Sequence, residues 1–132
     1  MRAMHRIGVV ALGIGCAALL CAATAPAAES EREIDGLIRA IGDSGCEFER
    51  NGSWHDAAAA RAHLQRKYDW LRKRDAAGNA EQFIERAATR SSVSGKPYRV
   101  RCRGRAPQPA SAWFGEQLRR QRQDAKTAGP TR

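Results

Sequence analysis

The stretch E81-QFIERAATRSSVSGKP-Y98 carries the signals that decide the fold. Just before it, Asn79 is a good N-cap, and Gln82 completes a capping box, so a helix is predicted over residues 80–89. A run of serines and a glycine follows, and these residues compete for backbone hydrogen bonds and end a helix. Pro97 then favours an extended chain. The stretch therefore predicts a helix, a hydroxyl-rich turn and a strand, and it contains no catalytic signature.

Three more helices are predicted from apolar residues at helical spacing. They cover about residues 31–42, residues 54–74, and a last segment that starts near Ser111 as its N-cap. Their apolar stripes are Ile34, Leu37, Ile38 and Ile41; Ala57, Ala60, Leu64, Tyr68 and Leu71; and Trp113, Phe114 and Leu118. Trp70 lies off the stripe of its helix, which makes it the one tryptophan of interest as a ligand platform.

Residues 46–50 and 98–105 alternate in polarity and predict two strands. An antiparallel pairing with Cys46 opposite Cys102 places Phe48 against Val100, and it brings Arg50 next to Tyr98. On the other face, the same pairing sets Glu47 against Arg101 and Glu49 against Arg99. A parallel pairing would put Phe48 opposite a glycine and lose the apolar pair, so the antiparallel pairing is favoured.

Residues 1–27 have the pattern of a signal peptide. Arg2 and Arg6 form a positive start, an apolar run follows, and Ala25-Pro26-Ala27 supplies the small residues of a cleavage site. We expect cleavage between Ala27 and Ala28. The apolar run is long for a signal core, so an uncleaved N-terminal anchor is the competing interpretation. Apart from this segment, no stable membrane span is expected.

Export leaves a pair of cysteines, Cys46 and Cys102, and an isolated pair in an oxidising compartment predicts a disulfide. This bond would close a loop of about 57 residues, which the chain-entropy model values at about 4 kcal/mol. The resulting prediction is a mainly α protein with a small β ribbon, an α+β fold. It has about four helices and one two-stranded antiparallel ribbon that is stapled by the disulfide. We assign one domain to residues 28–121 and a disordered basic tail to residues 122–132.

The net charge is +9, and it falls to +7 after cleavage because the signal peptide contains two arginines and no acidic residue. Such a charge favours an anionic partner. Export argues against nucleic acid as that partner. Of the basic residues, 19 are arginine, and a GC-rich genome produces the same bias without any partner.

Four motifs, taken together in this order, resemble the YfeK-like family of small exported bacterial proteins, a domain of unknown function. The resemblance covers about residues 31–104. It implies a periplasmic location and a compact, mostly helical domain, and it implies no activity, cofactor or catalytic residue. One departure is Asn79, where family members often have threonine, and either residue can cap a helix. The motifs are Phe48-x-Arg50-Asn51-Gly52, His63-Leu64-x-x-Lys67, Ala80-Glu81-Gln82-Phe83-Ile84 and Ser91-Ser92-x-Ser94-Gly95-Lys96-Pro97-Tyr98.

The first functional hypothesis is a non-catalytic module of the cell envelope that binds an anionic component or another protein. Hydroxyls, backbone N–H groups and clustered cations suit a carboxylate or phosphate. The candidate binding residues are Arg50, Asn51, His63, Lys67, Ser91, Ser92, Ser94, Lys96 and Tyr98.

The alternative hypothesis is a small hydrolase that uses a serine of residues 91–94 with His63. It requires a serine hydroxyl within hydrogen-bond reach of that histidine. No metal site is expected, because His55 and His63 would lie about 12 Å apart along one helix. No cofactor is expected either.

If the signal peptide is cleaved as expected, the mature chain begins at Ala28. Mass spectrometry of the protein from the envelope fraction should then give the mass of residues 28–132. A mass that corresponds to the chain from Met1 would instead identify a retained anchor.

Overall fold

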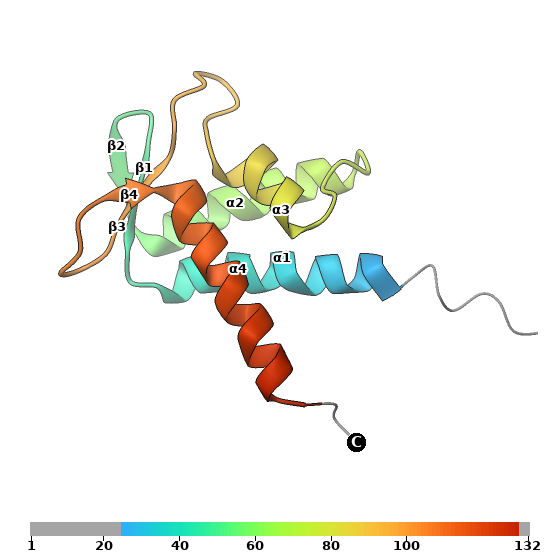
Figure 1. Ribbon diagram of the computed structural model, residues 1–132. Coiled ribbons are helices and arrows are strands. Elements are labelled where there is room, and N and C mark those ends of the chain that lie inside the picture. The colour runs from blue at the N-terminus through green and yellow to red at the C-terminus, as the bar shows by residue number, and fades with distance from the viewer. Residues whose placement is uncertain (1–24, 130–132) are drawn as a thin grey trace, which may run out of the picture.

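The computed structural model describes residues 25–129. The predicted signal peptide therefore lies outside the described residues except for its last three positions. Helices form most of the fold, and a small sheet stands at one end of them (Figure 1). The helices are α1 (Ala25–Asp43), α2 (Ala57–Arg72), α3 (Ala80–Phe83), the π-helix η1 (Ile84–Ala88) and α4 (Ala110–Thr127). No helix among residues 25–129 combines the length and apolarity needed to cross a membrane.

The sheet has four antiparallel strands in the order β2-β1-β3-β4. The α+β prediction is confirmed, and the predicted ribbon is the central pair, β1 with β3. Two strands must be added to it, because residues 53–55 fold back on β1 as a hairpin and residues 108–109 pair with β3. The strands are β1 (Glu47–Arg50), β2 (Ser53–His55), β3 (Arg99–Arg101) and β4 (Gln108–Pro109).

The predicted register of β1 and β3 is confirmed. Phe48 lies opposite Val100, while the two glutamates of β1 lie opposite Arg101 and Arg99. The predicted disulfide is confirmed as well: Cys46 and Cys102 are bonded, and their Cα atoms are 4.4 Å apart. The bond closes the end of the central pair that lies opposite the β1–β2 turn.

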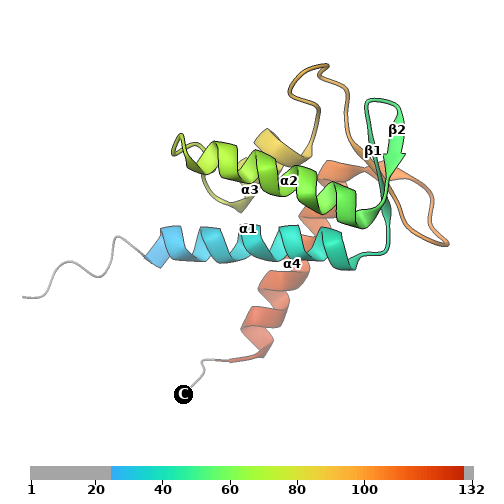
Figure 2. The same cartoon turned by 180° about the vertical axis from the view of Figure 1, so that it is seen from behind.

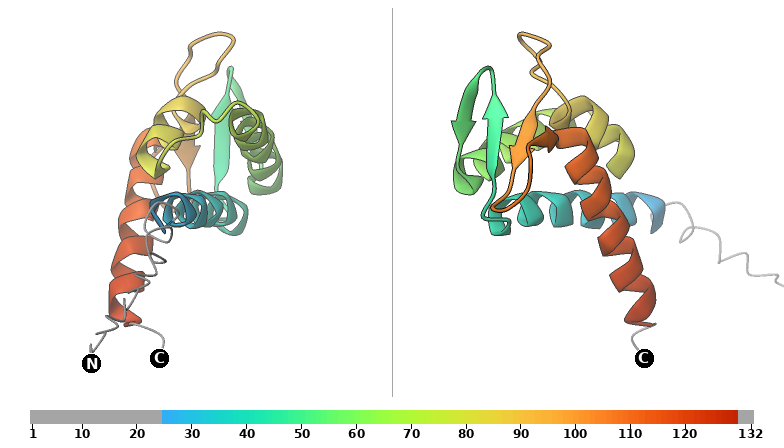
Figure 3. Two further views of the ribbon diagram at one scale, coloured as in Figure 1. Left: turned by 90° about the vertical axis from the view of Figure 1, so that its right-hand side faces the viewer. Right: turned by 60° about the vertical axis from the view of Figure 1, so that its left-hand side comes forward.

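α1 and α2 lie side by side along most of their length, and α4 crosses them on the other side of α1 (Figures 2 and 3). All three predicted helical stripes are buried except for Ala57, which is partly exposed. The sheet joins this core through Phe48, whose ring meets that of Trp113 edge-on at 5.4 Å. At the other end of the core, Tyr68 meets Phe83 in the same way at 5.3 Å.

The second helix begins later than predicted. It starts at Ala57, because the Asp56 carboxylate caps it by accepting a hydrogen bond from the backbone N–H of Ala59 at 2.8 Å. Trp54 and His55 therefore belong to β2. The prediction that His55 and His63 share one helix was wrong, since the hairpin that β2 forms with β1 competes successfully with helix extension.

The third helix keeps its predicted capping box, with Asn79 and Gln82 bonded to each other's backbone N–H groups. Its second half is a π-helix, in which the Thr89 hydroxyl donates to the carbonyl of Ile84 at 2.8 Å. Single π turns of this kind are frequent near functional sites. The π-helix ends at Ala88, and two residues separate it from the serine-rich segment that begins at Ser91.

The outer helices are longer than expected. α1 begins at Ala25, and α4 begins at Ala110 after Pro109, so Ser111 is not its N-cap. α4 continues to Thr127, past the expected end near residue 121. The Arg122 guanidinium explains the continuation, because it binds Glu33 of α1 at 2.8 Å and Glu81 of α3 at 2.6 Å. The domain limits at residues 28 and 121 stay predictions.

Replacing both bonded cysteines with serine should lower the free energy of unfolding by about 4 kcal/mol, because the unfolded chain gains the freedom of the opened loop. Thermal or denaturant unfolding of the double variant, Cys46→Ser with Cys102→Ser, measures the loss. A thiol titration of the denatured, unreduced mature protein should find no free thiol. Two thiols per chain would contradict the bond.

Candidate functional site

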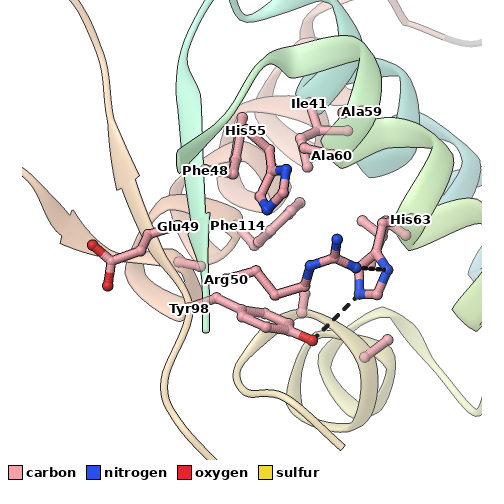
Figure 4. A pocket seen from close by; sticks show the side chains of 14 residues that line it. Ile41, Phe48, Glu49, Arg50, His55, Ala59, Ala60, His63, Tyr98 and Phe114 are labelled. Atoms are coloured by element: carbon pink, nitrogen blue, oxygen red, sulfur yellow. Dashed lines mark hydrogen bonds between the residues drawn. The ribbon is translucent and has the colours of Figure 1, made fainter. Parts of the chain in front are cut away.

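Arg50 stands at the end of β1, immediately before the tight turn to β2. Asn51 and Gly52 form that turn with positive φ angles of 51° and 82°, which these two residue types tolerate. The Arg50 side chain is half-buried and lies across the sheet toward α2 (Figure 4). One of its guanidinium nitrogens, Nη1, lies 2.5 Å from Nδ1 of His63.

This contact fixes the tautomer of His63. A guanidinium only donates hydrogen bonds, so Nδ1 of His63 accepts and the ring proton sits on Nε2. Nε2 then donates to the Tyr98 hydroxyl at 3.4 Å, the contact drawn in Figure 4. Arg50, His63 and Tyr98 thus form one hydrogen-bonded chain from three elements that are far apart in sequence.

Tyr98 is buried and lies immediately before β3 in the chain. Its backbone is fixed on both sides, since its N–H donates to Thr89 O and its carbonyl accepts from the N–H of Ala110, each at 2.9 Å. The hydroxyl also accepts a hydrogen bond from Nζ of Lys67 at 3.4 Å. Lys67 lies one helical turn after His63 on α2 and donates to the carbonyl of Arg90 as well, at 3.3 Å.

Burial and nearby cations disfavour further positive charge in this group of side chains. Burial, and then the charges of Arg50 and Lys67, lower the pKa of His63 from 6.5 to about 4, with smaller effects from Arg66 and His55. Burial and Arg50 also lower the pKa of Lys67. Burial raises the pKa of Tyr98, and Arg50 counteracts this in part.

No carboxylate neutralises these side chains among the described residues. The ion pairs of residues 25–129 join Arg99 to Glu49, Arg101 to Glu47, Arg120 to Glu116, and Arg122 to Glu33 and Glu81. Glu49 does line the neighbouring cavity, but its carboxylate is turned away from Arg50 (Figure 4). We call Arg50, His63, Lys67 and Tyr98 the cationic cluster.

A narrow apolar cavity of about 40 Å³ lies beneath the cluster. Alanines of α2, η1 and α4 line this cavity, and their small side chains do not fill it. Phe48 and Phe114 close its inner end. The volume suffices for a small group at most, so a larger ligand would lie above the cluster rather than inside the domain.

The predicted serines hold the loop of residues 91–96 in place. Ser91 is buried, and its hydroxyl accepts hydrogen bonds from the N–H groups of Val93 and Ser94 at 3.3 and 3.2 Å. The Ser94 hydroxyl donates to the side-chain oxygen of Asn51 at 2.5 Å, which ties this loop to the β1–β2 turn. Ser92 and Lys96 are exposed. The loop therefore lies beside the cationic cluster and is tied to the turn that follows Arg50.

The nine predicted binding residues thus divide into three groups. Arg50, His63, Lys67 and Tyr98 meet directly. Asn51, Ser91 and Ser94 position the two adjoining turns, and Ser92 and Lys96 remain on the surface. The two ring nitrogens of His63 are hydrogen-bonded to Arg50 and Tyr98, and the hydrolase hypothesis stays a prediction. Within residues 25–129, no three His, Cys, Asp or Glu side chains lie close enough to hold a metal ion.

Sequence reasoning missed three cations near the cluster, namely Arg66, Arg86 and Arg90. Arg66 lies three residues after His63 and one before Lys67, so helical spacing alone could have placed it on the same side of α2. No sequence signal could place Arg86, because it reaches this surface only through the packing of η1 beside α2.

Comparison with known proteins identifies the family of this chain. A model described as a family of unknown function, DUF5329, matches residues 28–122. The chain belongs to this family. An uncharacterized protein of Salmonella typhimurium, YfeK, is 36% identical over 91 residues, which cover 64% of this chain and 74% of that protein. No solved structure matches the chain.

The pKa of His63 predicts how stability depends on pH in this family member. Between about pH 6.5 and pH 4 the unfolded chain binds a proton at this histidine and the folded chain does not, so stability falls as the pH falls through this window. Solvent screening of a half-buried group limits the effect to on the order of 1 kcal/mol. His63→Gln should therefore lose less stability than the parent between pH 7 and pH 4.

Unfolding in urea at the two pH values measures this difference. His55→Gln is the matched control, because it removes a histidine outside the hydrogen-bonded chain and should retain the contribution of His63. Equal losses of stability in the parent and in His63→Gln would show that His63 does not resist protonation.

Proposed function

We propose that this protein is a non-catalytic binding module of the cell envelope, and that its cationic cluster binds a carboxylate or phosphate group of the partner. The observation that carries the proposal is the absence of a counter-charge: among the described residues, neither Arg50 nor Lys67 has a carboxylate partner. Their neighbours His63 and Tyr98 are neutral hydrogen-bonding groups, so a bound anion would complete the charge balance.

The types of side chain in the cluster support an anionic ligand. A guanidinium offers several N–H donors in a fixed plane that suits carboxylate and phosphate oxygens, and an ammonium adds a point charge. The hydrogen bond from Arg50 to His63 and the one from Lys67 to Tyr98 hold both cations in place before a ligand arrives. Side chains that are ordered in advance lose less conformational entropy on binding.

The disulfide supports a place in the envelope. Disulfides persist in oxidising compartments such as the periplasm, and the bond between Cys46 and Cys102 closes a fold with a modest core. We therefore propose a periplasmic location, which agrees with the signal-peptide pattern of the sequence. The partner is an acidic envelope component, or another envelope protein that presents an acidic group.

The double variant Arg50→Gln with Lys67→Gln should bind anions more weakly, because it removes both charges while it keeps a polar side chain at each position. Inorganic phosphate, titrated at low salt and followed by amide chemical shifts around Tyr98, should bind about tenfold more weakly to the variant. Retention of the protein on isolated envelope material should fall in parallel. Binding by the parent should weaken as salt rises, because the attraction is electrostatic.

Arg103→Gln with Arg105→Gln is the matched control. It removes the same charge from an exposed loop at the opposite end of the sheet from residues 91–96 (Figure 1). This control should bind phosphate as the parent does. If instead the Arg50 and Lys67 variant stays folded and binds phosphate with the affinity of the parent, the cluster is not the anion site.

A further inference from the structure

An open groove lies next to the cationic cluster, between α2 and η1. Its volume is about 330 Å³, far more than that of the cavity beneath the cluster. Helical spacing on α2 places His63, Lys67 and Trp70 along one side, and Arg86 of η1 forms the other. The serine-rich loop closes one end through Ser92. We call this feature the Trp70 groove.

Trp70 is 54% exposed, although a tryptophan in a domain of this size is usually buried in the core. The Arg74 guanidinium lies 3.8 Å from the centre of its ring and donates to the carbonyl of Trp70 at 3.1 Å. The stacked pair presents an aromatic ring and a cation on the same side of the helix. It makes no contribution to the core cluster of buried residues.

Val93 is 96% exposed and stands in the loop of residues 91–96. This loop rises away from the body of the domain, on the side where α2 and η1 lie next to each other (Figure 3). The Ser91 and Ser94 hydrogen bonds hold the loop in its raised position. Trp70 and Val93 are the two exposed large hydrophobic side chains of the described residues. Trp70 lines the groove, and Val93 directly follows Ser92, which lines it too.

Cations line the groove that contains Trp70 and the hollow next to it. Arg66, Arg86 and Lys67 line the groove, and Arg86 and Arg90 line the adjoining hollow below the loop, where Glu85 is the one carboxylate among the lining residues. None of these cations belongs to an ion pair within residues 25–129. We call the surface made by Trp70, Val93 and these cations the docking face.

We propose that the docking face binds a bilayer surface that presents anionic phospholipid headgroups. This inference rests on the proposed function, since the headgroup phosphate is the anion and the groove shares His63 and Lys67 with the cluster. Tryptophan prefers the interface between water and hydrocarbon, and a raised valine can enter it. Each nearby cation adds electrostatic attraction to a negative surface.

The shape of this face favours a bilayer over an acidic protein. An acidic protein surface would satisfy the cations and leave the raised, fully exposed Val93 without an apolar site to enter. A bilayer offers both phosphate oxygens for the cations and hydrocarbon for the apolar side chains. The stacked pair of Trp70 and Arg74 suits the boundary between headgroups and hydrocarbon. Its ring prefers the edge of the hydrocarbon, and its guanidinium prefers the headgroup layer.

Sedimentation with vesicles tests the proposal on the mature chain. One set of vesicles contains phosphatidylglycerol in phosphatidylcholine, and the other contains phosphatidylcholine alone. The parent should bind the anionic set about tenfold more strongly at low salt, and Trp70→Ala with Val93→Ser should reduce that binding by about tenfold. The emission of the parent should shift to the blue on binding, as Trp70 leaves water.

The variant Trp70→Ala with Val93→Ser should keep its melting temperature and its phosphate affinity, because both side chains are exposed and lie outside the hydrogen-bonded cluster. Arg103→Gln with Arg105→Gln, on the far loop, should keep vesicle binding. The single variant Val93→Ser is a further check on vesicle binding. The Val93 side chain is exposed, so its replacement should not disturb the fold.

Four outcomes would overturn the inference. Phosphate binding without vesicle binding would leave the proposed function standing and refute the docking face. Equal binding to both vesicle sets would refute the role of the cations. Binding to polyglutamate that matches vesicle binding and survives Trp70→Ala with Val93→Ser would assign the face to an acidic protein instead. Failure of the parent to bind either phosphate or vesicles would refute both proposals.

Discussion

The antiparallel pairing of β1 with β3 is the constraint on which the rest of the structure depends. At one end the disulfide between Cys46 and Cys102 closes the pair, and at the other end Arg50 and Tyr98 come together beside the β1–β2 turn. Phe48 and Val100 attach the inner face to the helices. A slip of one residue would turn every side chain of β1 to the opposite face, so the register that builds the core also builds the cationic cluster.

The sheet and α2 together position the residues of the cationic cluster. The strands set the separation of Arg50 from Tyr98, and α2 brings His63 and Lys67 into that gap. Burial, and then the charge of Arg50, lower the pKa of Lys67, so holding this partly buried cation without a carboxylate costs free energy. Proteins commonly tolerate such a local cost where a charged ligand binds, because the ligand removes it.

Much of the fold followed from local patterns. The capping box at Asn79, the three apolar stripes and the strand register need only neighbouring residues or a single pair of strands, and all of them hold. The errors fall where two local preferences compete. The segment at Trp54 has helical spacing but pairs with β1, and α4 outlasts its apolar stripe because Arg122 finds carboxylates on two other helices. Such long-range contacts leave no trace in local spacing.

The sequence by itself determined the fold class and the disulfide, because periodicity, cysteine pairing and strand register are short-range or pairwise properties. It named the four residues of the cationic cluster only among nine candidates. Only the tertiary structure decided how those residues act. It showed that the serines brace a loop while Arg50 reaches His63, and it brought Arg86 and Ser92 to the same groove as Trp70. Contacts between distant segments depend on how whole helices pack, and packing is a property of the folded chain.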